Sequence, residues 1–372
     1  MIPYKSHITH LTSVHPRFDT RIFHKMCSSL VEHGNIINLI VADGKGDEVN
    51  NGIRITDVGT FKNRLIRINL APKQIFDKAV TLNSDIYHLH DPELIPIGLK
   101  LKKLGKKVIF DSHEDIPQQI ISKSYMNPSV RWFTSKAFDF YQTWSCKQFD
   151  GIIAATPLIK DKFLAINSNT ENINNFPILD ELRNNIKWEH KQPFVSYVGS
   201  MTNYRGIKEI IKAMELVQSP VRLNLAGKFV EKKLYEDVVK LSGWKRTNNI
   251  GFISREGVHD LLMQSIAGLV TLHPVVNHID ALPVKLFEYM SSKIPVIASD
   301  FPLWRKIITK NDCGILVDPL NPVQIAETID YLVTHPKEAE RMGHNGRRAV
   351  IEHYNWRNEE KKLLQFYKKI IH

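Results

Sequence analysis

The stretch from Asp280 to Asp300, DALPVKLFEYMSSKIPVIASD, places a lysine and a glutamate at the start of a predicted helix. Lys285 and Glu288 are three residues apart, just after a proline, and so share the first turns of this helix. Free amides at a helix N-terminus and a lysine attract phosphate, whereas a carboxylate accepts hydrogen bonds from hydroxyl groups. The set suits a ligand with phosphates and hydroxyls. The alternative is an ordinary amphipathic helix packed by its apolar residues.

Other polar residues follow apolar, strand-like runs, and open parallel sheets bind ligands at the carboxyl ends of their strands. These candidates are His88, His90 and Asp91 in YHLHDPE, Asp111, His113 and Glu114 in IFDSHED, Ser200 to Arg205 in YVGSMTNYRG, Gly227 and Lys228 in LAGK, and His273 in TLHP. We expect His88 and His90 to face opposite sides of their strand, with His90 towards a cleft. For His113, the alternative is a helix start capped by Ser112, with Asp115 three residues later.

Short apolar runs alternate with helical patterns along the whole chain. An example of a helical pattern is TRIFHKMCSSLVEHG, whose apolar residues recur every three to four positions and which ends at Gly34. Buried-type strands that alternate with helices predict parallel sheets covered on both faces. The strand candidates are SHITHLT, NIINLIVA, IRITDVG, SDIYHLH, KKVIFDSH and DGIIAAT in the first half, and FVSYVGS, RLNLAGK, NNIGFIS, AGLVTLHP, PVIASD and CGILVD in the second.

Two successive runs of this kind predict an α/β protein of two doubly wound, Rossmann-like domains facing across a cleft. A polar stretch with two prolines, from Asn174 to Phe194, reads as the linker. We therefore expect domains at residues 1–178 and 190–355. The charged amphipathic segment 356–372 is expected to form a helix that returns to the first domain.

Composition limits the class of protein. The chain has 372 residues, of which 43% are hydrophobic and 24% charged, as in soluble globular proteins. We expect no signal peptide and no membrane-spanning helix, because the apolar runs are short and interrupted. Three distant cysteines form neither a disulfide framework nor a metal cluster and fit a reducing cytoplasm.

The net charge of +11 favours anionic partners. It divides into +4 for residues 1–185 and +7 for the rest, so we expect no basic arm or tail. No nucleic-acid-binding motif is evident, and nucleic acid is not the expected partner. No Asp-x-Asp occurs in the chain. Because such a pair would grip a divalent ion, we expect no required metal and no cofactor beyond the substrate.

The motifs YVGSMTNYRGIKEIIKA, LNLAGKF, IGFIS, LPVKLFEYMSSKIPVIASD and GILVDP make the second half resemble the nucleotide-sugar-binding domain of family 4 retaining glycosyltransferases, which have the GT-B fold. The first half, with HPRFDTRIFHKMCSSL, DIYHLHDPEL and VIFDSHED, is similar to the acceptor domain of that family. The resemblance covers nearly the whole chain and is strongest to members that build bacterial surface polysaccharides, such as O-antigen or capsule.

The resemblance assigns roles by motif. The second acid of the family's paired-acid signature matches Glu288 and would hold the donor ribose, and the first matches Asp280, near the hexose. The lysine of the family's Lys-Gly step matches Arg205, placed for the diphosphate, which Lys285 and Lys228 would also contact. The histidine that ends a strand of the first domain matches His113, near the reacting sugar.

This sequence departs from the family at two places. The glycine usual after the first signature acid is absent, and that acid is the shorter Asp280. The paired glycines of the first loop are replaced by TSVHPRFD. There, His15, Pro16, Asp19 and Arg21 would fill the space, with His15 towards the donor and Arg21 lining the cleft beside His90 and Glu114.

Two segments combine basic residues with apolar or aromatic ones, and they indicate where the protein meets its acceptor. FKNRLIRINLAPK carries Lys62, Arg64 and Arg67 among apolar residues and is expected to be a membrane-facing loop. KSYMNPSVRWFTSKAFDFYQTWSCK is either a second such surface or a core helix.

The resemblance implies a retaining, metal-independent hexosyl- or N-acetylhexosaminyltransferase. It would move a sugar from a nucleotide donor, expected to be a UDP-sugar, to a lipid-linked or saccharide acceptor. We expect it in the cytoplasm, peripheral on the anionic inner face of the inner membrane. The alternatives are a sugar-nucleotide epimerase of the same fold and a non-catalytic sugar-nucleotide-binding subunit of a polysaccharide assembly complex.

Overall fold

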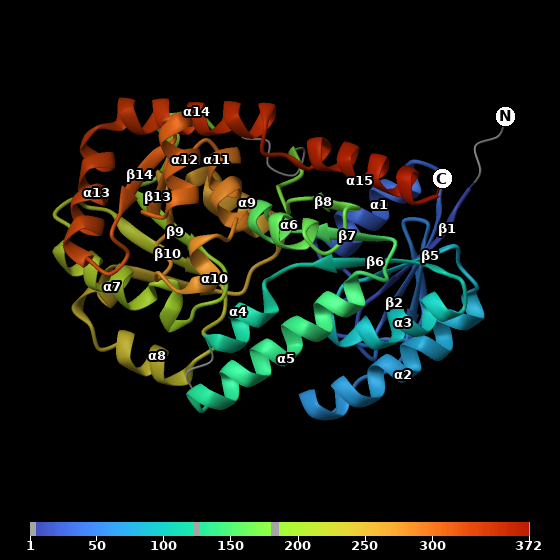
Figure 1. Ribbon diagram of the computed structural model, residues 1–372. Coiled ribbons are helices and arrows are strands. Elements are labelled where there is room, and N and C mark those ends of the chain that lie inside the picture. The colour runs from blue at the N-terminus through green and yellow to red at the C-terminus, as the bar shows by residue number, and fades with distance from the viewer. Residues whose placement is uncertain (1–4, 123–125, 180–185, 372) are drawn as a thin grey trace. The chain divides into compact units, whose positions relative to one another are not determined.

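The computed structural model describes residues 5–122, 126–179 and 186–371 and divides the chain into two compact units (Figure 1). Unit 1 comprises the chain up to Asn175 together with the segment from Arg357 onwards. Unit 2 runs from Phe176 to Trp356. The change of unit at Asn175 falls inside the polar stretch predicted as a linker, and the C-terminal segment belongs to unit 1.

Unit 1 is built on an eight-stranded sheet with the order β3-β4-β2-β1-β5-β6-β7-β8, in which β3 pairs antiparallel with β4 and the other pairs are parallel. Its strands are β1 His7–Leu11, β2 Ile36–Val41, β3 Glu48–Asn50, β4 Ile53–Asp57, β5 Ile86–Leu89, β6 Lys107–Ser112, β7 Gly151–Ala154 and β8 Thr170–Asn172.

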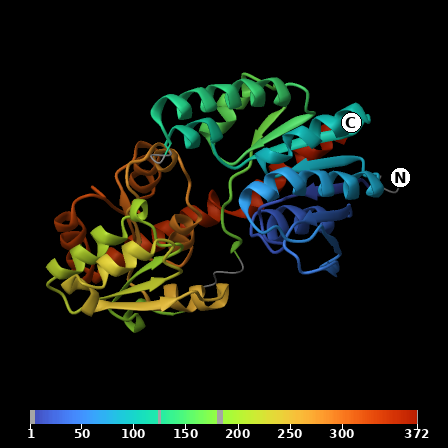
Figure 2. The same ribbon diagram turned by 90° about the horizontal axis from the view of Figure 1, so that it is seen from below.

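Helices cover both faces of this sheet (Figures 1 and 2). Several begin where a side chain accepts a hydrogen bond from the first free amides, as Asn63 does from Ile66 and Thr156 does from Ile159. The helices are α1 Ser28–Glu32, α2 Arg64–Leu82, α3 Ile95–Lys103, α4 Ile116–Ile121, α5 Pro128–Cys146, α6 Pro157–Leu164 and α15 Trp356–Ile371, with a π-helix at Ile22–Cys27 and a 3-10 turn at Pro92–Leu94.

The C-terminal helix α15 is bound to unit 1 by specific contacts. The Tyr367 hydroxyl lies 2.7 Å from Nδ1 of His88 on β5. Lys107 Nζ donates to the carbonyls of Ile370 and Ile371 at 2.6 and 2.7 Å, where the last carbonyls of a helix attract a cation. Helix α15 is therefore an integral part of the core of unit 1.

Unit 2 contains a wholly parallel six-stranded sheet with the order β11-β10-β9-β12-β13-β14. Its strands are β9 Phe194–Val198, β10 Arg222–Ala226, β11 Thr247–Gly251, β12 Ala267–Val270, β13 Val296–Ser299 and β14 Gly314–Val317. Its helices are α7 Ile207–Leu216, α8 Lys232–Val238, α9 Arg255–Gln264, α10 Val276–Ile279, α11 Val284–Ser291, α12 Pro302–Asn311, α13 Pro322–Thr334 and α14 Pro336–Glu352, with 3-10 turns at Trp188–His190, Asn203–Arg205 and Ser242–Arg246.

The predicted α/β class with two doubly wound sheets is confirmed, and each of the twelve predicted strand segments contains a strand. The short strands β3 and β8 were not predicted. The segment from Phe61 to Lys73 was predicted as a loop, which is wrong, since α2 begins at Arg64 behind the Asn63 cap. In the described parts of the chain, no helix is long and apolar enough to cross a bilayer.

The packing of α15 against β7 can be tested by substitution at Gly151. A Cβ added to Gly151 would lie 2.5 Å from the ring of Phe366 and 2.9 Å from Ile370, both buried on α15. We expect Gly151→Val to lower the free energy of unfolding by about 1–3 kcal/mol, because the added side chain overpacks the interface. Urea unfolding measures this change. The added substitution Phe366→Leu makes room and should restore part of the loss; no restoration would contradict the packing.

Candidate functional site

The carboxyl end of the sheet in unit 2 presents bare backbone. Gly199 directly follows β9 with φ +126°, and Gly227 directly follows β10 with φ +146°. A Cβ at Gly227 would stand 2.0 Å from the Gly199 carbonyl oxygen, so no larger residue fits this approach. The two glycines therefore let these strand ends approach each other closely, and we call this pair of strand ends the glycine floor.

Two cations converge on this floor. A Cβ at Gly199 would lie 3.2 Å from Lys285 Nζ and 3.5 Å from Arg205 Nη1. Among the residues that the structure describes, Lys285 Nζ has no hydrogen-bond partner, although the residue is only 9% exposed, and it lies 3.7 Å from the ring centroid of Tyr197. Burial and the nearby charge of Arg205 lower the pKa of Lys285 well below its usual value, against the opposing effect of Glu288. A buried pair of like charges is the electrostatic complement of an anion.

Helix α11 supplies the other groups of this cluster. Its N-cap is Pro283, which makes no side-chain capping hydrogen bond, so the first amides are not satisfied by the cap. Glu288 is buried one turn into the helix, with Oε1 3.5 Å from Arg255 Nη2. Lys285 and Glu288 thus lie near the same helix start, one positive and one negative.

The remaining predicted residues of unit 2 lie at nearby strand and helix ends. Lys228 follows β10 and places Nζ 5.2 Å from the ring centroid of the exposed Phe252. Asp280 directly follows α10, in the loop that precedes α11. Trp304, wholly buried, fixes this loop by donating from Nε1 to the Ala281 carbonyl at 2.7 Å.

Unit 1 contains a second cluster of polar side chains, which surrounds the carboxylate of Asp111 at the end of β6. Arg21 donates to it from Nε and Nη2 at 2.9 and 2.8 Å, and ring nitrogens of His90 and His113 lie 3.2 and 3.0 Å away. Burial alone would raise the pKa of Asp111, but Arg21 and His113 hold it well below its usual value. The carboxylate is therefore ionised and fully engaged.

Behind Asp111 lies a chain of buried histidines. His10 Nδ1 is 2.8 Å from His90 Nε2, and His88 Nδ1 bonds to Tyr367, as described above. Burial lowers the pKa of His10, His88 and His90, so these rings are neutral near pH 7. Two sets of ligand atoms, from His10, His88 and His90 and from His90, Asp111 and His113, lie close enough to hold a metal ion. Hydrogen bonds already link these side chains to each other.

Three sequence-based expectations for this cluster are wrong. His88 and His90 do not face opposite sides of β5: their rings stack with centroids 4.4 Å apart, because residues i and i+2 share a face of a strand. His90 is buried and lines no cleft. Arg21 is also buried, and its guanidinium is committed to Asp111 and to the Ile173 carbonyl at 2.8 Å. Arg21 and His90 therefore hold the Asp111 carboxylate in place.

The accessible part of the cluster is His113 with His15. The side chain of His113 is 21% exposed and that of His15 26%, and their ring centroids lie 5.0 Å apart. Burial disfavours the charged form of His15, but Asp19 and Asp91, at 3.3 and 3.4 Å, outweigh it and raise its pKa. Ser112 does not cap a helix here, because α4 begins behind Asp115. Exposed Glu114 accepts a hydrogen bond from Gln119.

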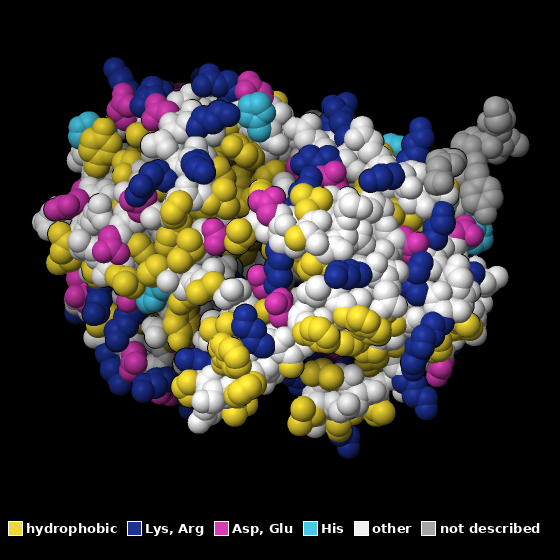
Figure 3. All heavy atoms as spheres, viewed as in Figure 1, with side chains coloured by type: hydrophobic (Ala, Val, Ile, Leu, Met, Phe, Trp, Pro, Cys, Tyr) yellow, Lys and Arg dark blue, Asp and Glu magenta, His cyan; other side chains and the backbone are white. Residues whose placement is uncertain are grey.

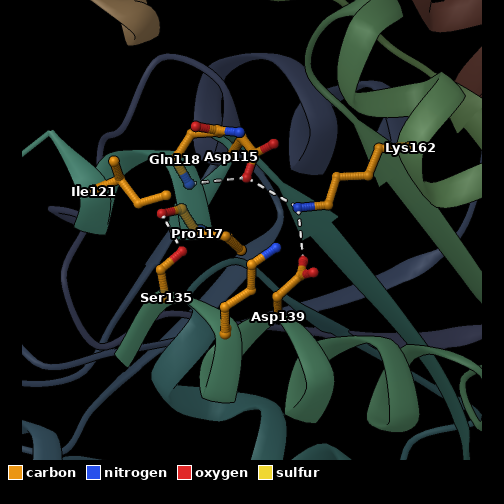
Figure 4. Close-up of a pocket in the computed structure, with 8 residues that line it drawn as sticks. Asp115, Pro117, Gln118, Ile121, Ser135, Asp139 and Lys162 are labelled. Atoms are coloured by element: carbon orange, nitrogen blue, oxygen red, sulfur yellow. Dashed lines mark hydrogen bonds and ion pairs between the residues drawn. The ribbon is translucent and has the colours of Figure 1, made fainter. Parts of the chain in front are cut away.

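A pocket of about 230 Å³ opens directly after this segment, between α4, α5 and α6 (Figure 4). Lys162 from α6 lies 3.0 Å from Asp115 and 3.1 Å from Asp139 of α5. Ser135 and Lys136 of α5 also line it. The pocket offers carboxylate and ammonium groups, which suit a hydroxylated ligand.

Several residues of the two clusters were not predicted. Tyr367, Tyr197 and Arg255 come from distant parts of the chain, and no local spacing points to them. His10 had a signal, since it lies in the predicted strand SHITHLT, whose end adjoins that of YHLH if the two strands pair. Lys62, Arg64 and Arg67, predicted for membrane contact, lie at the start of α2 and belong to neither cluster.

Comparison with known proteins identifies the family of the chain. Among curated proteins, an α-maltose-1-phosphate synthase of Mycobacterium tuberculosis is 26% identical over 192 residues, which are 48% of this chain and 48% of that protein. The chain thus matches about half the length of that relative.

Among solved structures, sucrose-phosphate synthase of Thermosynechococcus elongatus has a TM-score of 0.79 at 16% identity, with 99% of both chains covered. HepE of Anabaena in complex with UDP-glucose has a TM-score of 0.76 at 13% identity, covering 98% of this chain and 99% of the other. These likenesses confirm the GT-B fold. The model of Glycosyltransferase Family 4 matches residues 20–174 and that of Glycosyl transferases group 1 matches residues 179–349, and the chain belongs to the family 4 glycosyltransferases.

Proposed function

We propose that this glycosyltransferase moves a sugar, with retention of anomeric configuration, from a UDP-sugar to a lipid-linked or saccharide acceptor in the synthesis of a bacterial surface polysaccharide. One observation carries the proposal: the buried, unpartnered ammonium of Lys285 beside Arg205 at the glycine floor of unit 2. A protein interior tolerates such a cation where a ligand of opposite charge completes it. A diphosphate carries that charge.

Different residues of the unit 2 cluster would bind different parts of the donor. Arg205, Lys285 and the first amides of α11 would hold the diphosphate, and Lys228 would reach its outer oxygens. The Glu288 carboxylate would accept hydrogen bonds from the ribose hydroxyls. When the glycosidic bond breaks, the diphosphate gains negative charge, and cations fixed beforehand stabilise that charge without reorganising. The cations supply what a metal would, and so we propose a metal-independent reaction.

Unit 1 would supply the groups around the reacting sugar. His113, held by Asp111 through a 3.0 Å contact, would present its ring to the transferred hexose, and Asp280 from unit 2 would contact the same sugar. His15 would contact the donor at the place where the family has the paired glycines of its first loop. The pocket lined by Asp115, Asp139 and Lys162 would hold hydroxyl groups of the acceptor, with Glu114 at its border.

The solved relative in complex with UDP-glucose supports a UDP-sugar as donor, because its chain superimposes on nearly all of this one. We place the enzyme at the cytoplasmic face of the inner membrane, where lipid-linked saccharides are extended.

The test is incubation with a panel of nucleotide sugars, with released UDP and glycosylated product measured with and without a lipid-linked acceptor. Acceptor-dependent UDP release that survives EDTA is expected. Interconversion of the sugar nucleotide without an acceptor would establish an epimerase. Tight UDP binding without any turnover would indicate a non-catalytic subunit. Loss of turnover in EDTA, restored by Mg²⁺, would overturn the metal-independent mechanism.

The buried charge of Lys285 leads to a prediction about the stability of the protein. Because its folded-state pKa is lowered, the group destabilises the unliganded protein fully at low pH, and this cost disappears as pH rises into the usual lysine range. Lys285→Met should therefore raise the free energy of unfolding near pH 7, by about 1–3 kcal/mol. It should also weaken UDP binding by about 1.5–3 kcal/mol, the worth of a charge-assisted hydrogen bond.

Denaturant unfolding and titration calorimetry with UDP measure these two effects. Glu288→Ala is the matched variant: it should weaken UDP binding to a similar degree without the gain in stability. If UDP binds both folded variants as tightly as the original protein, the donor site lies elsewhere.

His113 should affect turnover rather than donor affinity. We expect His113→Ala to keep UDP affinity within a few-fold and to lower kcat strongly, because the residue meets only the transferred sugar. Asp111→Asn should act through His113: it should alter the pH dependence of kcat and leave UDP affinity intact. Unchanged turnover in His113→Ala would return this residue to a structural role.

A further inference from the structure

Helix α5 of unit 1 exposes several large aromatic side chains. Its buried side chains are Ser135, Gln142, Ser145 and Cys146, and Phe138 and Tyr141 pack partly buried against the core, but Trp132, Phe133, Phe140 and Trp144 are exposed. Phe133 is 66% exposed and Phe140 is 76% exposed. A helix of a globular protein usually shows the opposite pattern. The core therefore does not explain why α5 carries these aromatic residues.

The exposed apolar residues form a stripe. They recur at spacings of three and four, and so lie along one line of the helix. The stripe consists of Val130, Phe133, Ala137, Phe140 and Trp144, with exposed Trp132 beside it. Exposed Leu65 and Ile66 at the start of α2 add a second apolar site.

Helices α2, α3 and α5 lie in one layer on the same face of the unit 1 sheet, with α3 in contact with both others (Figures 1 and 2). Their solvent-facing sides therefore point the same way, away from the sheet. Figure 3 shows apolar side chains along the lower edge of the view, over α5 and the start of α2, with Lys and Arg side chains beside them.

This layer concentrates positive charge. Its three helices hold nine lysines and arginines against two aspartates, Asp77 and Asp139. Asp139 is paired with Lys162, and of the nine cations Lys102 is paired with Asp150 and Arg67 with Glu93. Their net charge of +7 exceeds the +4 of residues 1–185 as a whole, so the rest of that half is net negative. On α3, Lys100 and Lys103 are exposed between the two apolar sites.

We propose that the outer face of α2, α3 and α5 is a docking surface for an anionic lipid bilayer, with the α5 stripe inserted among the acyl chains and the lysines of α3 on the headgroups. Trp and Phe are enriched at the membrane interface, and basic residues bind anionic leaflets. Aliphatic Val130, Leu65 and Ile66 suit acyl chains rather than stacked nucleobases. The charge is complementary to anionic lipid and would oppose docking of a second copy.

The proposal rests on the proposed function for the nature of the acceptor, which would be extended at the bilayer surface. The greater part of the surface lies on α5 and α3. Of the three residues that the sequence suggested, exposed Lys62 and Arg64 adjoin Leu65 and Ile66, and Arg67 is engaged with Glu93, its Nε lying 3.3 Å from that carboxylate.

The experiment is flotation of the full chain with phosphatidylcholine vesicles that do or do not contain phosphatidylglycerol. We expect binding only to the anionic vesicles, weakened by high salt. Phe133→Ser with Phe140→Ser, and separately Lys100→Ser with Lys103→Ser, should each weaken binding about tenfold or more. The controls lie on unit 2 and should bind like the original chain: Leu320→Ser with Ile351→Ser, both also exposed, and Lys232→Ser with Lys233→Ser.

Acyl-brominated lipids should quench tryptophan fluorescence in the original chain and much less in Trp132→Phe with Trp144→Phe. If the α5 and α3 variants bind vesicles as tightly as the original chain, the proposed docking surface is wrong. It is also wrong if these variants still bind vesicles but lose binding to single-stranded RNA or lose the ability to form a dimer in solution. UDP affinity without vesicles should be equal in all variants. If the chain uses no nucleotide sugar yet the variants lose vesicle binding, the proposed function fails and the surface stands.

Discussion

The unpartnered ammonium of Lys285 is the constraint around which unit 2 is arranged. Removing a charge from water without a counterion is costly, and here the cost is increased by Arg205 on the same glycine floor. Three features keep the group in place: the Tyr197 ring 3.7 Å away, its position on α11, and the packing of that helix by Leu286, Phe287, Tyr289 and Met290. The apolar residues that make α11 an ordinary core helix therefore hold the charge buried.

The two clusters treat buried charge in opposite ways. In unit 1 the Asp111 carboxylate has a bidentate arginine and two histidines, and the neighbouring histidines are neutral and bonded to each other or to Tyr367. A hydrogen-bonded network of this kind fixes the orientation of one ring, that of His113, although His88 Nε2 has no hydrogen-bond partner among the described residues. In unit 2 the Lys285 ammonium has no hydrogen-bond partner among the described residues. The first arrangement positions a side chain, and the second leaves a buried donor for the proposed diphosphate.

The fold was largely predictable because parallel strands are continuous apolar runs and helices show a 3.6-residue period, both of which are local signals. The strands that were missed, β3 and β8, have three residues each and show too little pattern. Lys285 and Glu288 were predictable because one helix carries both. Tyr367 was not, because its partner His88 is 279 residues away and only tertiary packing joins them.

The error at His90 and the alternative left open at α5 have a common physical origin. Sequence patterns show which residues share a face of an element, but not which face the fold buries. His88 and His90 share the face that α15 covers, so both are buried with Tyr367. On α5 the aromatic stripe is regular enough to read as a core face, yet Ser135, Gln142 and Ser145 take the inner side. A chain that buries serine and glutamine while exposing phenylalanine leaves its apolar free energy available outside the fold. The same helix layer carries nine cations, of which Lys102 and Arg67 are paired with acids, and the anionic bilayer that we propose as partner complements both its positive charge and its exposed apolar side chains.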